Sequence, residues 1–324
     1  MPSEQGERQV AGERDEALVS LIMPVWRPRS EWLHAAVDSA LAQRGCAIEL
    51  IVVDNGNDTP VATMLADVRD PRLRIVRVDH GGVSAARNAG MAESGGDFLR
   101  FLDCDDVFEP DSTRRLLALT DDATIAYGAT AYCDAELRPY KTVVCSLEGA
   151  IVTHGLTDFT VALPSLLFPR RVIELAGRWD ESMTICEDWD FVQRALEYAC
   201  VRGEPVVASH YRRHSTSSVG TASIDLAERS AARVVANYVA RHPEQRRAPH
   251  VRRATAMRLT SAGDRYLQSG SRGRAVSRFA AALRADPGYA TREVFRILTR
   301  EIRARRSSRA AGDESSETLS FRTK

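Results

Sequence analysis

Short apolar runs alternate with amphipathic stretches along the first third of the chain. The runs have the length of buried strands and end in turn residues. They are 17–23, 49–53, 73–78 and 98–102. Apolar residues at helical spacing predict a helix after the first run, with Ser30 as its N-cap, and another at 84–93 after a Gly-Gly pair. This alternation predicts an α/β fold, with a Rossmann-like, mostly parallel sheet flanked by helices.

The rest of the chain changes character twice. Residues 123–146 are β-like and irregular, and a last strand is expected at 206–211. After about residue 223 the sequence becomes rich in Ala and Arg with helical periodicity. Within it, 257–286 resembles one tetratricopeptide-type helical hairpin, although a plain helical tail explains it equally well.

The bulk composition is that of an ordinary globular protein. The 324 residues carry 44 acidic and 44 basic side chains, so no overall charge selects nucleic acid or membrane. The chain has no apolar run long enough for a transmembrane span, and residues 1–16 lack the apolar core of a signal peptide. Six scattered cysteines form no CxxC pair, which argues against a zinc site or a disulfide framework. We therefore expect a cytoplasmic protein.

An acidic cluster follows the strand expected at 98–102. Asp103, Asp105 and Asp106 stand within four positions of one another, where a parallel sheet binds ligands. Carboxylates this close repel one another unless a cation or hydrogen-bond donors hold them, and a divalent ion bridging to phosphate would resolve the repulsion. A simple capped turn is the alternative.

Two further features extend this candidate site. The first two strands also end in polar turns, at 24–26 and at Asp54, and should share one sheet edge with the acidic cluster. A second acidic cluster, containing Glu187 and Asp188, opens a predicted helix. Acids at a helix start are also favoured by the helix dipole, so a structural role is the alternative.

Together these motifs resemble family 2 glycosyltransferases with the GT-A fold, over roughly residues 17–220. The Gly-Gly-Val-Ser-Ala-Ala-Arg-Asn-Ala-Gly segment at 81–90, combined with Asp-x-Asp-Asp at 103–106, carries the resemblance most specifically. Motifs in the same order are 19–26, 49–56, 179–181, 187–188 and 211–214. The expected organisation is a lead at 1–16 without ordered structure, a GT-A domain at 17–220, a helical region at 221–302 and a disordered tail at 303–324.

The resemblance implies a role for each matching residue. Pro24, Val25 and Trp26 line the nucleotide pocket, Asp54 contacts the base, Arg87 lies near base and phosphates, and Asp103 holds the ribose or the metal. Asp105 ligates a divalent ion, Mn2+ or Mg2+, and His214 is a further metal or phosphate contact. Asp188 is the general base, and Glu187 orients the acceptor or caps the helix.

The implied activity is inverting, hexosyltransferase-type transfer of a sugar from a nucleotide-diphosphate donor to an acceptor. A UDP-sugar is the expected donor, and the acceptor is a saccharide, a lipid-linked molecule, a small molecule or a peptide. Asn55, Asn57 and His80 depart from the usual family residues, which leaves the donor base open.

Two other functions remain as alternatives. A nucleotidyltransferase would need a Gly-rich, Lys-bearing phosphate loop after the first strand, and 24–28 has none. A non-catalytic nucleotide-sugar-binding scaffold would act through its helical tail. The arginines of that tail suit contact with anionic lipid or with acidic partners, and a solvated helix face is the simpler interpretation.

Overall fold

The computed structural model describes residues 17–215, 217 and 221–317, with side chains as far as Arg303. The expected lead at 1–16 and the end of the expected tail, 318–324, lie outside the described residues. The chain divides into two compact units, Met1–Ala222 and Ser223–Lys324. The sequence predicts a boundary two residues earlier, between residues 220 and 221.

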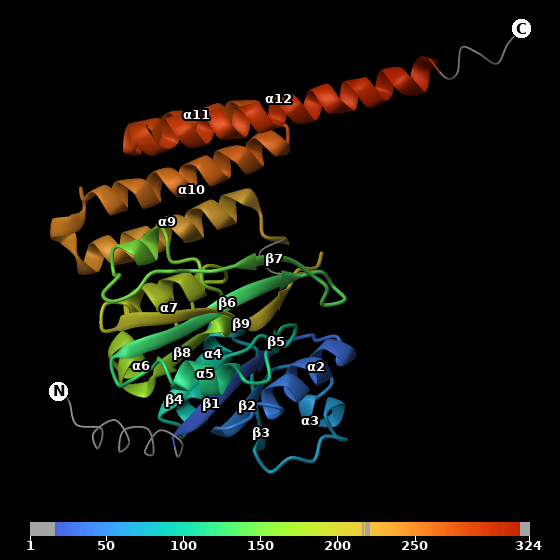
Figure 1. The fold of residues 1–324 in the computed structure, drawn as a ribbon, viewed down its shortest axis with the longest axis vertical. Coiled ribbons are helices and arrows are strands. Elements are labelled where there is room, and N and C mark those ends of the chain that lie inside the picture. Colours follow the sequence, from blue (N-terminus) through green and yellow to red (C-terminus); the bar gives the residue numbers. More distant parts are fainter. Residues whose placement is uncertain (1–16, 216, 218–220, 318–324) are drawn as a thin grey trace, which may run out of the picture. The chain divides into compact units, whose positions relative to one another are not determined.

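Parallel strands form one half of the sheet in the first unit. The strands are β1 (Leu18–Val25), β2 (Ala47–Asn55), β3 (Leu73–Val78) and β4 (Phe98–Phe101). They lie in the order β3-β2-β1-β4, and each neighbouring pair is parallel (Figure 1). β1 continues through Pro24 to Val25, which lies opposite Asp54. The carboxyl ends of β1, β2 and β4 therefore share one edge, as the sequence predicted.

Helices flank this half of the sheet. They are α2 (Ser30–Leu41), α3 (Val61–Met64), α4 (Gly82–Glu93) and α5 (Ser112–Leu117). The N-cap of α2 is Arg29, without a side-chain cap, so the prediction that Ser30 caps this helix is wrong. α4 packs very closely on β1, because a Cβ at Gly90 would lie 2.5 Å from the Ile22 side chain. This contact fixes α4, and with it Arg87 and Asn88, against the sheet.

The other half of the sheet mixes strand directions. Its strands are β5 (Val107–Phe108), β6 (Thr124–Cys133), β7 (Pro139–Val143), β8 (Leu166–Pro169) and β9 (Cys200–Arg212). β8 pairs antiparallel with both β4 and β6, and so joins the two halves. β6 and β9 are parallel, whereas β5 and β7 are antiparallel to their partners. In the described part of the chain this gives a nine-stranded mixed sheet.

The segment between β8 and β9 carries two helices, α6 (Arg170–Ala176) and α7 (Glu187–Ala195). Aromatic packing anchors α7 to the sheet. Trp179 stacks on Phe191 with ring centroids 4.0 Å apart, and Phe101 of β4 meets Trp179 edge-on at 5.1 Å. Trp179 is almost fully buried, so it belongs to the core and does not line a pocket. The start of α7 is thereby held against the end of β4.

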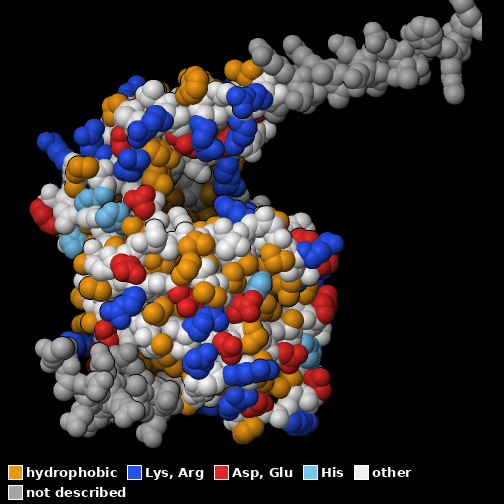
Figure 2. Space-filling model, in the orientation of Figure 1, with side chains coloured by type: hydrophobic (Ala, Val, Ile, Leu, Met, Phe, Trp, Pro, Cys, Tyr) orange, Lys and Arg blue, Asp and Glu red, His pale blue; other side chains and the backbone are white. Residues whose placement is uncertain are grey.

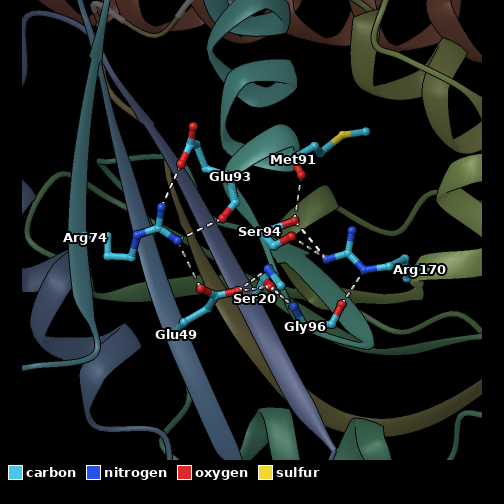
Figure 3. A network of polar contacts seen from close by, with 9 residues as sticks. Ser20, Glu49, Arg74, Met91, Glu93, Ser94, Gly96 and Arg170 are labelled. Atoms are coloured by element: carbon cyan, nitrogen blue, oxygen red, sulfur yellow. Dashed lines mark hydrogen bonds and ion pairs between the residues drawn. The ribbon is translucent and has the colours of Figure 1, made fainter.

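A polar network closes the amino end of the sheet, away from the acidic cluster (Figure 3). Glu49 accepts hydrogen bonds from the Ser20 hydroxyl and the Gly95 amide, both at 2.6 Å. Arg74 lies 2.7 Å from Glu93. Arg170 donates to the Gly96 carbonyl at 2.5 Å and to Ser94 at 3.0 Å. These contacts join the end of α4 to the sheet and to α6.

The second unit is helical. It comprises α9 (Ile224–Arg241), α10 (Pro249–Gln268), α11 (Arg272–Ala285) and α12 (Pro287–Glu317), with a short 3-10 turn at Pro243–Gln245. α10 and α11 pack tightly, because a Cβ at Gly263 would lie 2.5 Å from the Phe279 ring. α12 continues to Glu317 and so overlaps the first part of the tail expected at 303–324. No helix among the described residues is long and apolar enough to cross a membrane.

Candidate functional site

The turn after β2 is organised around Asp54, whose side chain is buried. One carboxylate oxygen accepts from the amide and side chain of Asn57, at 3.0 and 2.7 Å. The other accepts from the Val61 amide at 3.0 Å and from Arg77 at 2.9 Å. Burial alone would raise the pKa of Asp54, but these hydrogen bonds and the Arg77 charge bring it below its ordinary value. Both oxygens are engaged, so these contacts make Asp54 a residue that positions the turn.

The turn after β1 is tied to the same network. Asn57 donates to the Val25 carbonyl at 2.9 Å and accepts from the Arg27 amide at 2.6 Å. Arg27 is held in the left-handed region at φ 46°. Pro24 and Val25 are buried, whereas Trp26 is 46% exposed and stacks on His80 with centroids 4.7 Å apart. An exposed aromatic pair therefore stands beside the two turns.

Asn55 has a use that the sequence did not suggest. Its side-chain oxygen accepts from the Gly81 amide at 3.1 Å, which fixes the loop that starts α4. An aspartate at this position could accept the same bond, but it would add a negative charge.

Arg87 is the centre of the site. Its guanidinium donates to Asp103 at 2.8 Å and to Glu187 at 2.9 Å, and its side chain is only 3% exposed. Burial disfavours the charged form, yet Asp103 and Glu187 raise the pKa of Arg87 above its usual range. The guanidinium also lies 4.6 Å from the Trp179 ring centroid. Arg87 therefore joins the turn after β4 to the first residue of α7.

Asp188 follows Glu187 at the start of α7 and is exposed to solvent. Cys186, the N-cap residue, has φ 61°, a left-handed conformation that turns the chain sharply into the helix. Crowding by protein atoms and the charge of Asp103 raise the pKa of Asp188, and Arg87 opposes this shift. Burial and the neighbouring Asp188 likewise raise the pKa of Glu187. A solvent-accessible carboxylate with a raised pKa has the properties of a general base.

Asp105 and His214 form a second pair. The His214 Nε2 atom lies 2.8 Å from an Asp105 carboxylate oxygen. Burial and the neighbouring Asp103 raise the pKa of Asp105. The His214 ring packs on Trp32 of α2, with centroids 4.7 Å apart. A carboxylate and an imidazole are thus held side by side at the end of the sheet.

Tyr211 shows that the two acidic clusters lie together. Burial raises the pKa of its hydroxyl, and so do the negative charges of four nearby carboxylates. These belong to Asp106, Asp103, Asp188 and Asp105. Together with the Arg87 ion pairs to Asp103 and Glu187, these charges place the two acidic clusters close to each other.

Sequence reasoning missed the residues that hold this arrangement. Asn88 accepts from the Trp179 amide at 2.8 Å and donates to Glu181 at 2.8 Å, which fixes the segment before α7. Arg212 donates its amide to the buried Asp106 and its Nε to the Asp105 carbonyl, both at 2.7 Å. Both lie within predicted motifs, at 81–90 and 211–214, but the motifs alone did not indicate which partners these two side chains have.

The arrangement provides donors and acceptors of the kind a phosphorylated sugar nucleotide requires. Within the described residues, no group of three or more His, Cys, Asp or Glu side chains is arranged to hold a metal ion. The mixed sheet, with acid-rich ends on its parallel strands, is the arrangement of a GT-A-type fold.

Comparison with known proteins gives the family. Residues 20–164 match the model described as glycosyl transferase family 2. The succinoglycan biosynthesis protein ExoO of Rhizobium meliloti is 30% identical over 178 residues, which is 50% of this chain and 51% of that protein. The uncharacterized glycosyltransferase RP339 of Rickettsia prowazekii is 26% identical over 225 residues, 65% of this chain and 69% of that protein. Residues 20–164 of the first unit are therefore similar to glycosyl transferase family 2.

The fold agrees with a solved structure. The crystal structure of S. aureus TarS 1-349 in complex with UDP-GlcNAc has a TM-score of 0.54 at 13% identity, over 82% of this chain and 90% of that one. At this identity the likeness concerns the fold alone. The chain spans about half the length of ExoO.

Proposed function

We propose that the first unit is an inverting glycosyltransferase that moves a sugar from a nucleotide-diphosphate donor to an acceptor hydroxyl. The observation that carries the proposal is the Arg87 bridge. It holds Asp103, at the end of β4, within reach of the α7 start that bears Asp188. A donor bound over the strand ends would then present its anomeric carbon beside a carboxylate that is open to solvent.

On the donor side, the preformed turns after β1 and β2 supply the nucleotide pocket. The Trp26–His80 pair offers an aromatic surface for a base, and Asp54 acts by holding the turns in place. The UDP-GlcNAc complex of the TarS relative favours a UDP-sugar as donor. Asn55 and His80 are the positions at which we expect this chain to differ in base preference.

Asp105 and His214 fit a divalent ion, Mn2+ or Mg2+. The Asp105 carboxylate is the kind of oxygen ligand that these hard ions prefer, and the His214 Nε2 atom lies 2.8 Å from it. These two residues would hold the ion, and the donor diphosphate would supply further oxygen ligands. When bound, the ion would neutralise charge that develops on the diphosphate leaving group.

In the transfer step, the acceptor oxygen forms a bond to the anomeric carbon while the bond from that carbon to the diphosphate oxygen breaks. The acceptor hydroxyl proton passes to the Asp188 carboxylate. Attack from the side opposite the leaving group inverts the anomeric centre. Arg87 acts through others, because it holds Asp103 and Glu187 and lowers the pKa of Asp188.

Nucleotide binding tests the proposal. Isothermal calorimetry with UDP, GDP, dTDP and CDP, with and without Mn2+, is applied to the wild type and to Asp105→Ala. We expect one nucleotide to bind tightly, in a manner that needs both Mn2+ and Asp105. A folded protein that binds none of the four would overturn the assignment of the site. Metal-independent binding that survives Asp105→Ala would overturn the metal assignment alone.

A further inference from the structure

The second unit presents a row of large apolar side chains to solvent. Phe295, Leu298 and Ile302 of α12 are 72%, 42% and 52% exposed. Their spacing of three and four residues places them on one face of the helix. The opposite face of α12 is packed, because Ala290 and Ile297 are buried in the unit. The row is therefore an outward face and not a poorly buried core.

Arginines border this apolar row. At helical spacing, Arg292, Arg296 and Arg303 follow one another along its edge. α11 repeats the pattern, with Val276 66% exposed and Leu283 39% exposed between Arg272 and Arg284. Figure 2 shows blue and orange side chains interspersed over α11 and α12. Both helices thus combine exposed apolar groups with cationic ones.

The charge of this unit is strongly one-sided. Between residues 223 and 303 the sequence holds seventeen arginines and seven acidic residues, although the whole chain is neutral. Several of the arginines are paired, such as Arg278 with Glu228 and Arg300 with Asp264. The arginines outnumber the acids by more than two to one, so pairing leaves a net positive unit.

We propose that the outward face of α12 docks the protein on an anionic lipid bilayer. An exposed apolar row bordered by arginines is the pattern of a helix that lies in a membrane interface, where apolar side chains enter the acyl boundary and arginines meet lipid phosphates. A nucleic acid would use the arginines but not the protruding Phe295 and Ile302. Docking of this face on the same face of a second copy would bring two positive surfaces together. This inference is independent of the proposed transfer activity.

Vesicle co-sedimentation tests the proposal with the full chain. The lipids are phosphatidylcholine alone, and phosphatidylcholine with about one third phosphatidylglycerol. We expect binding to the anionic vesicles only, weakening as salt is raised because the arginine contribution is screened. The double variant Phe295→Ser, Ile302→Ser should lower the vesicle partition coefficient about tenfold, because much apolar area is removed from the interface.

A matched control distinguishes docking through α12 from non-specific binding through any exposed apolar side chain. Leu175 of α6 is 51% exposed in the first unit, and Leu175→Ser should bind vesicles as the wild type does. Circular dichroism and nucleotide binding should be unchanged in both variants, since the altered side chains face solvent. Equal binding of the double variant and the wild type would overturn the proposal. Binding to neither kind of vesicle would also overturn it. A salt-sensitive dimer that forms without lipid and is lost in the double variant would overturn it as well.

Discussion

Replacing Arg87 by glutamine removes the cation that joins Asp103 to Glu187. The two carboxylates differ in their access to water, at 36% and 11% side-chain exposure. Water can replace the guanidinium at Asp103, but Glu187 is left buried beside Asp188 without a positive partner. The variant should therefore lose stability mainly through Glu187.

The size of the loss follows from the geometry. Breaking a buried ion pair by removing one partner costs about 3–5 kcal/mol. Because Asp103 is partly hydrated, we expect a loss near the lower limit, about 3 kcal/mol. Without Arg87, the folded-state pKa of Glu187 rises further above its value in the unfolded chain. The loss of stability in Arg87→Gln is then present near pH 8, where the Glu187 carboxyl is charged. It becomes smaller toward about pH 5, as this carboxyl takes up a proton.

Urea unfolding at both pH values measures this loss. Arg74→Gln is the matched control, since Arg74 also lies between two glutamates but is 48% exposed. We expect the control to lose less than about 1 kcal/mol. Adding Glu187→Gln to Arg87→Gln should recover much of the lost stability, because the uncompensated charge is then removed.

Two outcomes would refute this reasoning. One is an Arg87→Gln protein as stable as the Arg74→Gln control. The other is a loss that is the same at both pH values and is not relieved by Glu187→Gln, which would assign the effect to lost packing on Trp179.

Three further predictions concern other parts of the chain. Gly263→Val should destabilise the helical unit by about 1–3 kcal/mol in thermal melts, because the new side chain forces Phe279 aside. The control Gly273→Ala should be neutral or slightly stabilising, because no atom lies near its added Cβ. Asp54→Asn should cost about 1–3 kcal/mol and raise the donor Kd in calorimetry, because an amide cannot accept from all of its donors; the exposed Asp58→Asn should change neither. The rate of donor hydrolysis should fall as the pH decreases through the raised pKa of Asp188. Arg87→Lys should leave this acidic side of the pH–rate profile in place, whereas Arg87→Gln should move it to higher pH. An unmoved profile in Arg87→Gln would contradict the charge argument.

The strands and their shared edge could be predicted because local pattern determines them. Apolar runs ended by turn residues placed β1 to β4 within a few residues, and parallel pairing then required the ends of β1, β2 and β4 to meet. The mixed half was not predictable in this way. Antiparallel pairing of β8 with both β4 and β6 depends on contacts between segments far apart in sequence.

The site residues were found by motif, but their partners were not. Arg87 and Glu187 are a hundred positions apart, and no local pattern indicates that they form an ion pair. The resemblance implies that Asp54 contacts the base. Only the fold shows that four hydrogen bonds from Asn57, Val61 and Arg77 engage both of its oxygens.

In the proposed mechanism, one site binds a nucleotide-sugar and the Asp188 carboxylate in that site is the base. The most direct test compares UDP binding and the slow hydrolysis of a UDP-sugar by water in the wild type and in Asp188→Asn. For Asp188→Asn we expect an unchanged Kd for UDP and a fall in kcat of about a hundredfold or more. Hydrolysis that continues at the wild-type rate in a variant that still binds UDP would contradict the assignment of Asp188.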